Sequence, residues 1–186
     1  MWGEVGDSGE IDRIFINTSY PINLAIKIQR SLVPSFKGQY EHSVDNKGRV
    51  AFPAKLRKLV NPDANDRFTI LRGLEPCLYL YPQDQWEAVE DKLAGINSFR
   101  KNGRTVIRNF LRYAEDLALD KQNRISLPSH LMEWSDINSS AIFIGSGDRI
   151  EIWSPGKLEE IDNELDFEAY QDLFEQVMGD EPEHEL

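Results

Sequence analysis

The chain of 186 residues has a mass of 21.4 kDa, enough for one ordinary domain or two small ones. Its 40% hydrophobic and 28% charged residues exclude a collagen-like, fibrous or fully disordered chain. The single cysteine, Cys77, excludes an intramolecular disulfide and a multi-cysteine metal site and fits a reducing compartment. The acidic N-terminus does not resemble a signal peptide, and no apolar run is long enough to span a bilayer. We therefore expect a cytoplasmic protein that does not enter a membrane.

The net charge of −11 is unevenly distributed along the chain. Residues 158–186 contain twelve Asp or Glu and no Lys or Arg, so residues 1–157 hold 21 basic against 20 acidic side chains. A net negative charge argues against nucleic-acid binding, because such binding relies on Lys and Arg that displace counterions from phosphates. The body of the chain is nearly neutral, however, and five of its basic residues fall between positions 47 and 58. This asymmetry keeps nucleic acid among the candidate partners.

Residues 1–35 come first and show no clear periodicity beyond a short stretch at 22–28. We predict a weakly ordered N-terminal extension, and an overlong assignment of the start codon would explain the segment equally well.

Two copies of one pattern follow, at residues 36–91 and 114–157. The spacing Asp-x-x-x-Arg-x-x-x-Pro-x-x-Leu begins at Asp45 and again at Asp120, at an offset of 75. A second apolar block, at residues 68–82 and 141–155, matches at an offset of 73. Shared order, spacing and hydrophobic pattern indicate a duplication. Because about 45 residues bury too little surface to be stable alone, we expect the two copies to pack on each other.

Each copy is predicted to form strand, turn, strand, short helix, strand, turn and strand. In the first copy, strands at 40–44 and 50–52 flank a polar turn at 45–48, and Pro53 opens the helix, where its missing N–H costs nothing. Gly48 corresponds to Asn123, and these residue types take a positive φ most readily, which indicates a shared left-handed turn position. Residues 145–147, Gly-Ser-Gly, lack the spacing of a nucleophile elbow or a phosphate loop and are predicted to be a hairpin turn.

Residues 92–113 are predicted to link the copies, with helices at 84–93 and 104–113. If residues 99–113 form one helix, Gly103 is a point where it could break, and its two faces carry different residues. One face would hold Arg100, Arg104, Arg108 and Arg112, and the other Phe99, Val106, Phe110 and Tyr113. The arginine row is either simply solvated or in contact with phosphate or the acidic tail.

Residues 158–186 are predicted to form an acidic C-terminal helix and tail. Apolar residues recur at helical spacing from Leu158 to Val177, so the helix, expected over 159–175, can dock one face on the body. Residues 179–186 are expected to be loose.

Enzyme signatures are weak. We predict no catalytic residues, no metal ligands, no cofactor and no small-molecule substrate. The histidines stand at no metal-ligand spacing from one another or from Cys77. The paired Asp and Arg are the strongest signal, and two interpretations of them stay open. A carboxylate at a turn can accept backbone N–H bonds and hold the arginine, so that Asp45, Gly48, Asp120 and Asn123 shape the turns. Alternatively, the arginines contact phosphate or read guanine in a major groove.

The candidate DNA-binding residues are cations on or near the two predicted hairpins. The first hairpin would present Arg49 and Lys47, with helix residues Lys55, Arg57 and Lys58 nearby. The second hairpin supplies Lys121 and Arg124.

At these residues the sequence resembles the MraZ family of bacterial regulators, which are built from two SpoVT-AbrB-type repeats. The resemblance covers about residues 36 to the early 160s. It rests on Phe36-Lys-Gly-x-Tyr-x-His42, Asp45-x-Lys-Gly-Arg49, Cys77-Leu-Tyr-Leu-Tyr-Pro82 with Trp86, and Asp120-x-x-x-Arg124-Ile-x-Leu-Pro128. The chain departs from the family at Asn123, where many members have Gly, and in its 35-residue leader.

The resemblance implies an α+β fold of tandem AbrB-like swapped-hairpin β modules with short helices, linker helices and a C-terminal acidic helix. It also implies a ring-shaped homo-oligomer, association with the nucleoid, and binding of double-stranded DNA at direct repeats. Those repeats would lie in the promoter of the division and cell wall gene cluster, including the chain's own gene. On this pattern Arg49 is the first candidate reader, followed by Lys47. The alternatives are an AbrB-type antitoxin that binds a partner protein through its acidic tail, and an enzyme of unfamiliar type.

Overall fold

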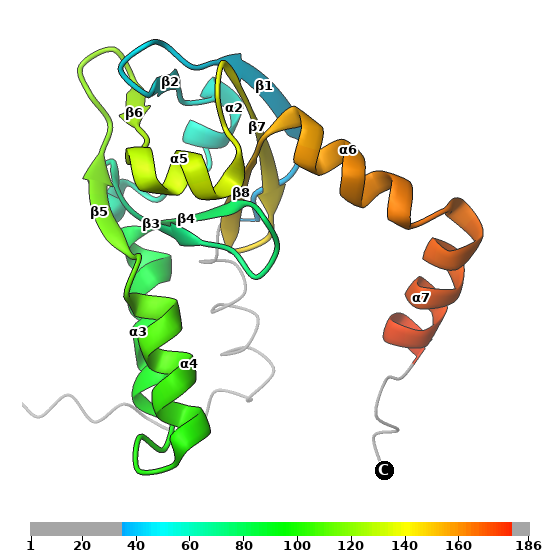
Figure 1. Cartoon of the computed structure of the whole chain (residues 1–186). Coiled ribbons are helices and arrows are strands. Elements are labelled where there is room, and N and C mark those ends of the chain that lie inside the picture. The colour runs from blue at the N-terminus through cyan, green and yellow to red at the C-terminus, as the bar shows by residue number, and fades with distance from the viewer. Residues whose placement is uncertain (1–34, 180–186) are drawn as a thin grey trace, which may run out of the picture. The chain divides into compact units, whose positions relative to one another are not determined.

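The computed structural model describes residues 35–179, which form antiparallel sheets and helices, in agreement with the predicted α+β class (Figure 1). Residues 1–34 of the predicted extension and residues 180–186 of the predicted tail lie outside the described residues. The elements in chain order are β1 (Gln39–Ser43), β2 (Arg49–Ala51), α2 (Ala54–Arg57), the 3-10 helix η1 (Pro62–Ala64), β3 (Arg67–Arg72), β4 (Leu78–Pro82), α3 (Gln83–Ala94), α4 (Lys101–Leu111), β5 (Glu115–Ala118), β6 (Arg124–Ser126), α5 (Ser129–Ser135), β7 (Ser140–Ser146), β8 (Arg149–Trp153), α6 (Pro155–Glu164) and α7 (Phe167–Gly179).

Strands of both repeats combine in a six-stranded antiparallel sheet with the order β1-β7-β8-β4-β3-β5. Strand β1 of the first repeat pairs with β7 of the second, and Tyr40 lies opposite Phe143. Strand β5 of the second repeat pairs with β3 of the first, and Phe68 lies opposite Leu117. The N-terminal hairpins are therefore exchanged between the repeats. Because each copy supplies an edge strand to the other, the two copies form one folded unit.

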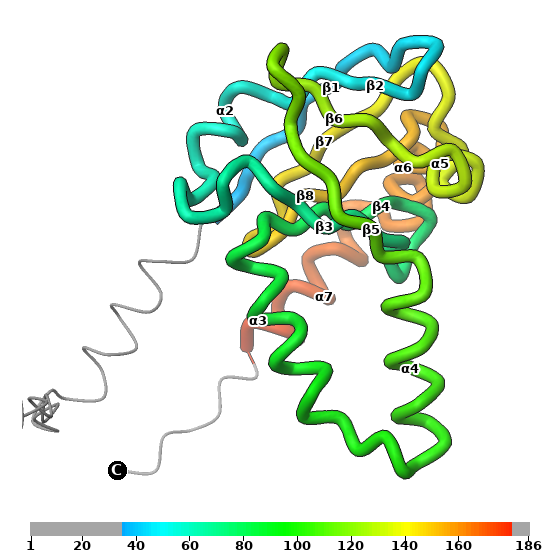
Figure 2. The backbone as a smooth tube through the Cα atoms, turned by 90° about the vertical axis from the view of Figure 1, so that its left-hand side faces the viewer, coloured from blue at the N-terminus to red at the C-terminus, as the bar shows by residue number. Residues whose placement is uncertain are grey.

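The second sheet consists of β2 and β6 and relates the two repeats by a local two-fold symmetry. Val50 lies opposite Ile125, its equivalent at the offset of 75. The flanking bonds repeat in the same way: the backbone N–H of Phe52 donates to the Asn123 carbonyl at 2.9 Å, and that of Leu127 to the Gly48 carbonyl at 2.8 Å. The duplicated sequence thus builds a duplicated structure, with both hairpin turns at one end and the α3–α4 pair at the other (Figure 2).

Two apolar clusters occupy the opposite faces of the six-stranded sheet. Alternation along β4 directs Leu78 and Leu80 into the cluster beneath β2 and β6, and Tyr79 and Tyr81 into the other. Helices α3, α4 and α6 cover the second face, and their contributions to this cluster include Trp86, Phe110 and Leu158. The central strands β3 and β4 are therefore buried on both faces, whereas the edge strands β1 and β5 are partly exposed.

The linker segment folds into the helix pair α3 and α4. Helix α3 confirms the helix predicted over 84–93, and α4 runs through Gly103, so the possible break at that residue does not occur. Gly103 instead permits a close approach, since a Cβ there would lie 2.2 Å from the Asn97 carbonyl oxygen. The predicted apolar face is only partly buried. Phe110 stacks on Trp86 with 6.2 Å between ring centroids, while Phe99 is 93% exposed.

The acidic C-terminal segment forms two helices, α6 and α7, and the single helix predicted over 159–175 is wrong. Leu165 is extended, with φ −118° and ψ 100°, and Asp166 Oδ1 accepts the Ala169 N–H at 2.8 Å to cap a new helix. Leu158 is buried and Ile161 packs beside it, so the predicted docking holds for α6. It is wrong for α7, whose apolar side chains are exposed, among them Phe167, Tyr170, Phe174 and Val177.

Candidate nucleic-acid interface

The first hairpin turn is built around the carboxylate of Asp45. Its Oδ1 accepts the backbone N–H groups of Lys47 at 2.9 Å and Arg49 at 3.0 Å. Its Oδ2 accepts Nε of Arg49 at 2.8 Å and lies 2.6 Å from Nη2 of the same guanidinium. One carboxylate therefore closes the turn and orients the arginine at the same time.

The second hairpin repeats this geometry at Asp120. Oδ1 accepts the backbone N–H groups of Gln122 at 2.7 Å and Arg124 at 3.0 Å, and Oδ2 accepts Nε and Nη2 of Arg124 at 2.8 and 2.7 Å. The structural interpretation of the Asp–Arg spacing therefore describes both turns. Each aspartate occupies only the Nε–Nη2 side of its guanidinium, so the terminal edge formed by Nη1 and Nη2 points away from this pair.

These contacts also set the protonation of the two aspartates. The side-chain hydrogen bond from Arg49, followed by the Arg49 backbone N–H, holds the pKa of Asp45 well below its ordinary value. Arg124 lowers the pKa of Asp120 by the same two contacts, and the Asp45 side chain raises the pKa of Arg49. Both aspartates are thus ionised near neutral pH.

Gly48 and Asn123 occupy equivalent left-handed positions, as the sequence predicts. Their φ angles are 73° and 57°. A Cβ at Gly48 would lie 3.1 Å from both the Leu127 carbonyl oxygen and the Met132 sulfur. Glycine thus meets the backbone requirement in one copy, and asparagine, which tolerates this conformation, meets it in the other. A hairpin turn between β7 and β8 is also confirmed, but of the predicted residues 145–147 only Gly147, with a φ of 73°, lies in the turn, because Gly145 and Ser146 belong to β7.

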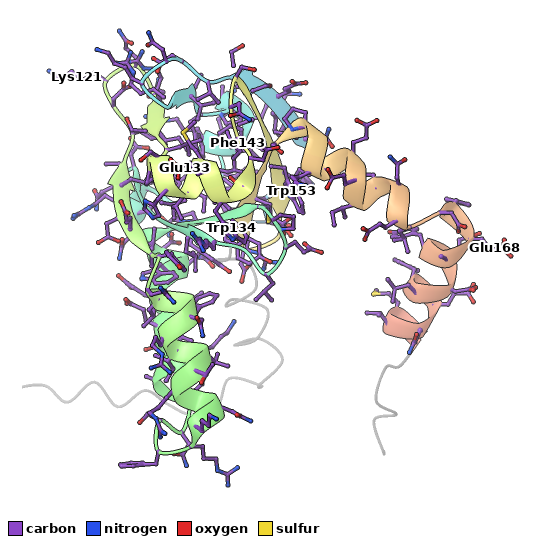
Figure 3. All side chains as sticks on the ribbon, in the orientation of Figure 1. Lys121, Glu133, Trp134, Phe143, Trp153 and Glu168 are labelled. Atoms are coloured by element: carbon purple, nitrogen blue, oxygen red, sulfur yellow. The ribbon has the colours of Figure 1, made fainter. Side chains whose placement is uncertain are left out.

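The hairpin exchange changes which of the predicted cations are neighbours. Lys47 and Lys121 are exposed on the turns, and Figure 3 shows Lys121 at the tip of the second hairpin. Arg57 and Lys58, which follow the first hairpin in the sequence, share a groove with Gln122 and Asn123 of the second. We expected these helix cations beside the first hairpin because they follow it in the sequence, although the swapped hairpins implied by the family resemblance place them beside the second.

Two of the helix α2 cations already have partners within the protein. Nη2 of Arg57 lies 3.0 Å from Oδ2 of Asp66, and Nζ of Lys55 lies 5.8 Å from the centre of the Tyr40 ring. Lys58 is exposed and lines the groove. On geometry alone, Lys58 is the helix cation best placed for an external anion.

One cluster of polar side chains was missed by the sequence reasoning. Glu75, Cys77 and Glu151 bring three potential ligand atoms within 4.8 Å of one another. Burial raises the pKa of the Cys77 thiol, and Glu151 also accepts hydrogen bonds from Trp153 and Arg149. A protonated thiol is a poor metal ligand, and none of the three residues belongs to an Asp–Arg turn. Glu75 and Cys77 lie in the connection between β3 and β4 and Glu151 lies on the neighbouring strand β8, so no local spacing could have revealed the cluster.

Helices between residues 35 and 179 are too short or too polar to cross a membrane. The paired Asp–Arg turns and the exchanged strands define a tandem protein of the swapped-hairpin class. A family model described as "MraZ protein, putative antitoxin-like" matches residues 35–109 and again residues 110–176. The chain therefore belongs to the MraZ family.

Relatives in several bacteria carry the name "Transcriptional regulator MraZ". The protein of Caldanaerobacter subterraneus subsp. tengcongensis is 42% identical over 129 residues, which cover 69% of this chain and 87% of the relative. That of Halothermothrix orenii is 41% identical over 119 residues, covering 64% and 80%. That of Syntrophomonas wolfei is 38% identical over 143 residues, covering 77% and 96%. The name is that of a regulator and not of an enzyme, as the sequence predicts for this chain.

Proposed function

We propose that this chain is a sequence-specific DNA-binding transcriptional regulator whose two hairpin turns read base edges in the major groove. The observation that carries the proposal is the arginine on each turn, whose guanidinium donates hydrogen bonds to the neighbouring aspartate and is held in place by it. The relatives' name supports the regulator class.

An arginine that is held by an aspartate is suited to contact a base edge for a geometric reason. A guanine presents two acceptors, O6 and N7, and a guanidinium reads them with two parallel N–H groups. With the Nε–Nη2 side of Arg49 held by Asp45, the Nη1–Nη2 edge is free to make this bidentate contact. Because the side chain is already ordered, less conformational entropy is lost on binding. The structural and the functional interpretations of the Asp–Arg spacing are therefore compatible.

The other predicted residues have supporting roles in this proposal. Lys47 on the first turn is the second candidate reader after Arg49, whereas Lys121 on the second turn and the α2 cations Lys55, Arg57 and Lys58 are positioned for phosphates. Phosphate contacts fix register and orientation, while Arg49 and Arg124 carry the sequence information.

The finer parts of the proposal concern targets and assembly. We propose direct repeats in the promoter of the division and cell wall gene cluster, including the chain's own gene, and association with the nucleoid. We also propose a ring-shaped homo-oligomer, which would raise the effective concentration of each hairpin at repeated sites. The exposed apolar side chains of the α4 and α7 regions support assembly, since Phe99 and Phe167 are 93% and 76% exposed.

The test is a salt-titrated gel shift on DNA from upstream of the chain's own gene and on a scrambled duplex. We expect selective binding that weakens as salt rises and is lost in Arg49→Ala. The matched control is Arg108→Ala, which removes one exposed arginine from α4 and should keep the selectivity. Equal binding of both duplexes by folded wild-type protein would contradict the proposal.

A second candidate function is an antitoxin-like module that binds a partner protein through its acidic tail. The observation that favours it is α7, which exposes apolar side chains and contains acidic but no basic residues. Truncation after Leu165 separates the two functions and keeps Leu158 and Ile161 of α6 in place. A regulator would retain selective DNA binding without α7, whereas the antitoxin-like module would lose its partner in a pull-down.

A further inference from the structure

The local two-fold symmetry produces two equivalent surface grooves, each formed where the hairpin of one repeat meets the helix of the other. The first groove lies between the second hairpin, at Gln122 and Asn123, and α2 with the loop that follows it. The second groove lies between the first hairpin, at Lys47 and Gly48, and α5 with its following loop. Figure 3 shows Glu133 on α5 beneath the hairpin end of the fold. The same backbone scaffold is thus present twice.

The charges in these grooves do not obey the symmetry. At the offset of 75, Lys58 corresponds to Glu133, Arg57 to Met132, and Asn61 to Asp136. Each of these replacements makes the second groove more negative than the first. The charged lining residues are Arg57, Lys58 and Asp66 in the first groove, and Asp45, Lys47, Glu133 and Asp136 in the second. Glu133 and Asp136 are both exposed, so their charges face the solvent in which a nucleic acid would lie. A duplication that conserved the Asp–Arg turns has therefore reversed the charge beside them.

We propose that Glu133 and Asp136 are orientation-determining residues, which keep phosphates out of the second groove so that each module binds DNA in a single direction. The α2 groove receives the phosphodiester backbone through Lys58 and Arg57. The α5 groove repels it, because like charges placed together across an interface are strongly unfavourable. This inference rests on the proposed DNA-binding function and adds to it a polarity that the symmetric hairpins cannot supply.

Polarity has a direct consequence for the arrangement of sites. A module with symmetric charges would accept the backbone on either flank and bind a site equally well after a half-turn about the local axis. A module with one basic and one acidic flank distinguishes these two orientations. Copies carried by one assembly then engage sites repeated in the same direction.

Reciprocal charge variants test this inference. The logarithm of the DNA-binding constant falls linearly with the logarithm of salt concentration. Lys58→Ala should reduce the magnitude of this slope by about 0.9, the contribution of one phosphate contact. The combined variant Glu133→Lys and Asp136→Asn, which copies the first groove onto the second, should raise that magnitude by about 0.9. The control is Glu87→Lys, which makes the Glu133→Lys exchange at an exposed site of α3 and should leave the slope unchanged.

Ethylation interference then locates the phosphates. We expect wild-type protein to be blocked by ethylated phosphates on one flank of each site, and Lys58→Ala to lose sensitivity on that flank. The Glu133→Lys and Asp136→Asn variant should gain sensitive phosphates on the opposite flank.

Two results would overturn the inference while leaving the proposed function intact. One is selective binding by wild-type protein with equal phosphate contacts on both flanks. The other is a combined variant that remains folded and selective but gains no contacts on the second flank. Absence of selective binding by the wild type would instead contradict the proposed function itself.

Discussion

The aspartate of each turn gives opposite predictions depending on whether charge or preorganisation dominates at the hairpin. Replacing Asp45 with Asn removes a negative charge from a surface proposed to bind DNA, so simple electrostatics predicts tighter binding. The same change keeps Oδ1, which accepts the Lys47 and Arg49 backbone N–H groups at 2.9 and 3.0 Å. It removes the Oδ2 acceptor that holds the Arg49 side chain. The substitution therefore releases the guanidinium and leaves the turn closed.

Preorganisation predicts weaker selective binding by Asp45→Asn. Immobilising one flexible side chain on binding reduces affinity by a factor of about 2 to 13. Deleting the reader in Arg49→Ala removes a bidentate base contact, which corresponds to a factor of about 5 to 150. We thus expect selectivity to decrease in the order wild type, Asp45→Asn, Arg49→Ala, while affinity for scrambled DNA stays equal or rises in Asp45→Asn.

Fluorescence anisotropy with labelled operator and scrambled duplexes at one fixed salt concentration measures this order. Asp91→Asn, which removes the same charge from an exposed position on α3, is the matched control and should behave as wild type. Tighter operator binding by Asp45→Asn with unchanged selectivity would refute the preorganisation argument and leave the aspartate a purely structural role.

Three further predictions concern the stability of the paired hairpins. Urea unfolding should show that Gly48→Val costs about 1 to 3 kcal/mol, because a β-branched residue is forced to φ 73°, whereas Gly48→Asn costs less, as Asn123 already holds this conformation. Val50→Ala should lower the free energy of unfolding by roughly 2 kcal/mol, because it removes two carbon atoms from a fully buried side chain. Unfolding should remain a single transition because both repeats share one core, and two separate transitions would contradict this. The pKa values of Asp45 and Asp120 are lowered in the folded state, so their stabilisation is complete above about pH 4 and is lost as pH falls through the lowered values. The stability difference between wild type and the double Asp→Asn variant should therefore shrink below pH 4, and a difference that grows there would contradict the assignment.

Local chemistry could be predicted from the sequence with good accuracy. Each Asp–Arg turn, and the left-handed position at Gly48 or Asn123 within it, depends on residues within five positions of each other. The helix α3 and the exposed lysines of the turns follow from similarly local patterns. In such segments the physical cause, a capping carboxylate or a positive φ, depends only on residues that are close together in the sequence.

Relations between distant segments could be predicted only in outline. Periodicity indicated that α4 and α7 have apolar faces, but it does not say what covers them, and Phe99 and Phe167 remain exposed within the described residues. The pairing of β1 with β7 joins residues about 100 positions apart, and the same exchange moves the α2 cations to the second hairpin. The helix break at Leu165 arises because Asp166 caps a new helix, a competition that apolar spacing does not detect.

The most direct test of the central claim, that the turn arginines read base edges, is methylation interference at guanine N7. Methylation of N7 removes the acceptor used in a bidentate contact and leaves the phosphates unchanged. We predict that specific methylated guanines block binding by the wild type, that Arg49→Ala loses sensitivity at one of them, and that Arg124→Ala loses it at another. An interference pattern identical in the wild type and both variants would contradict the claim.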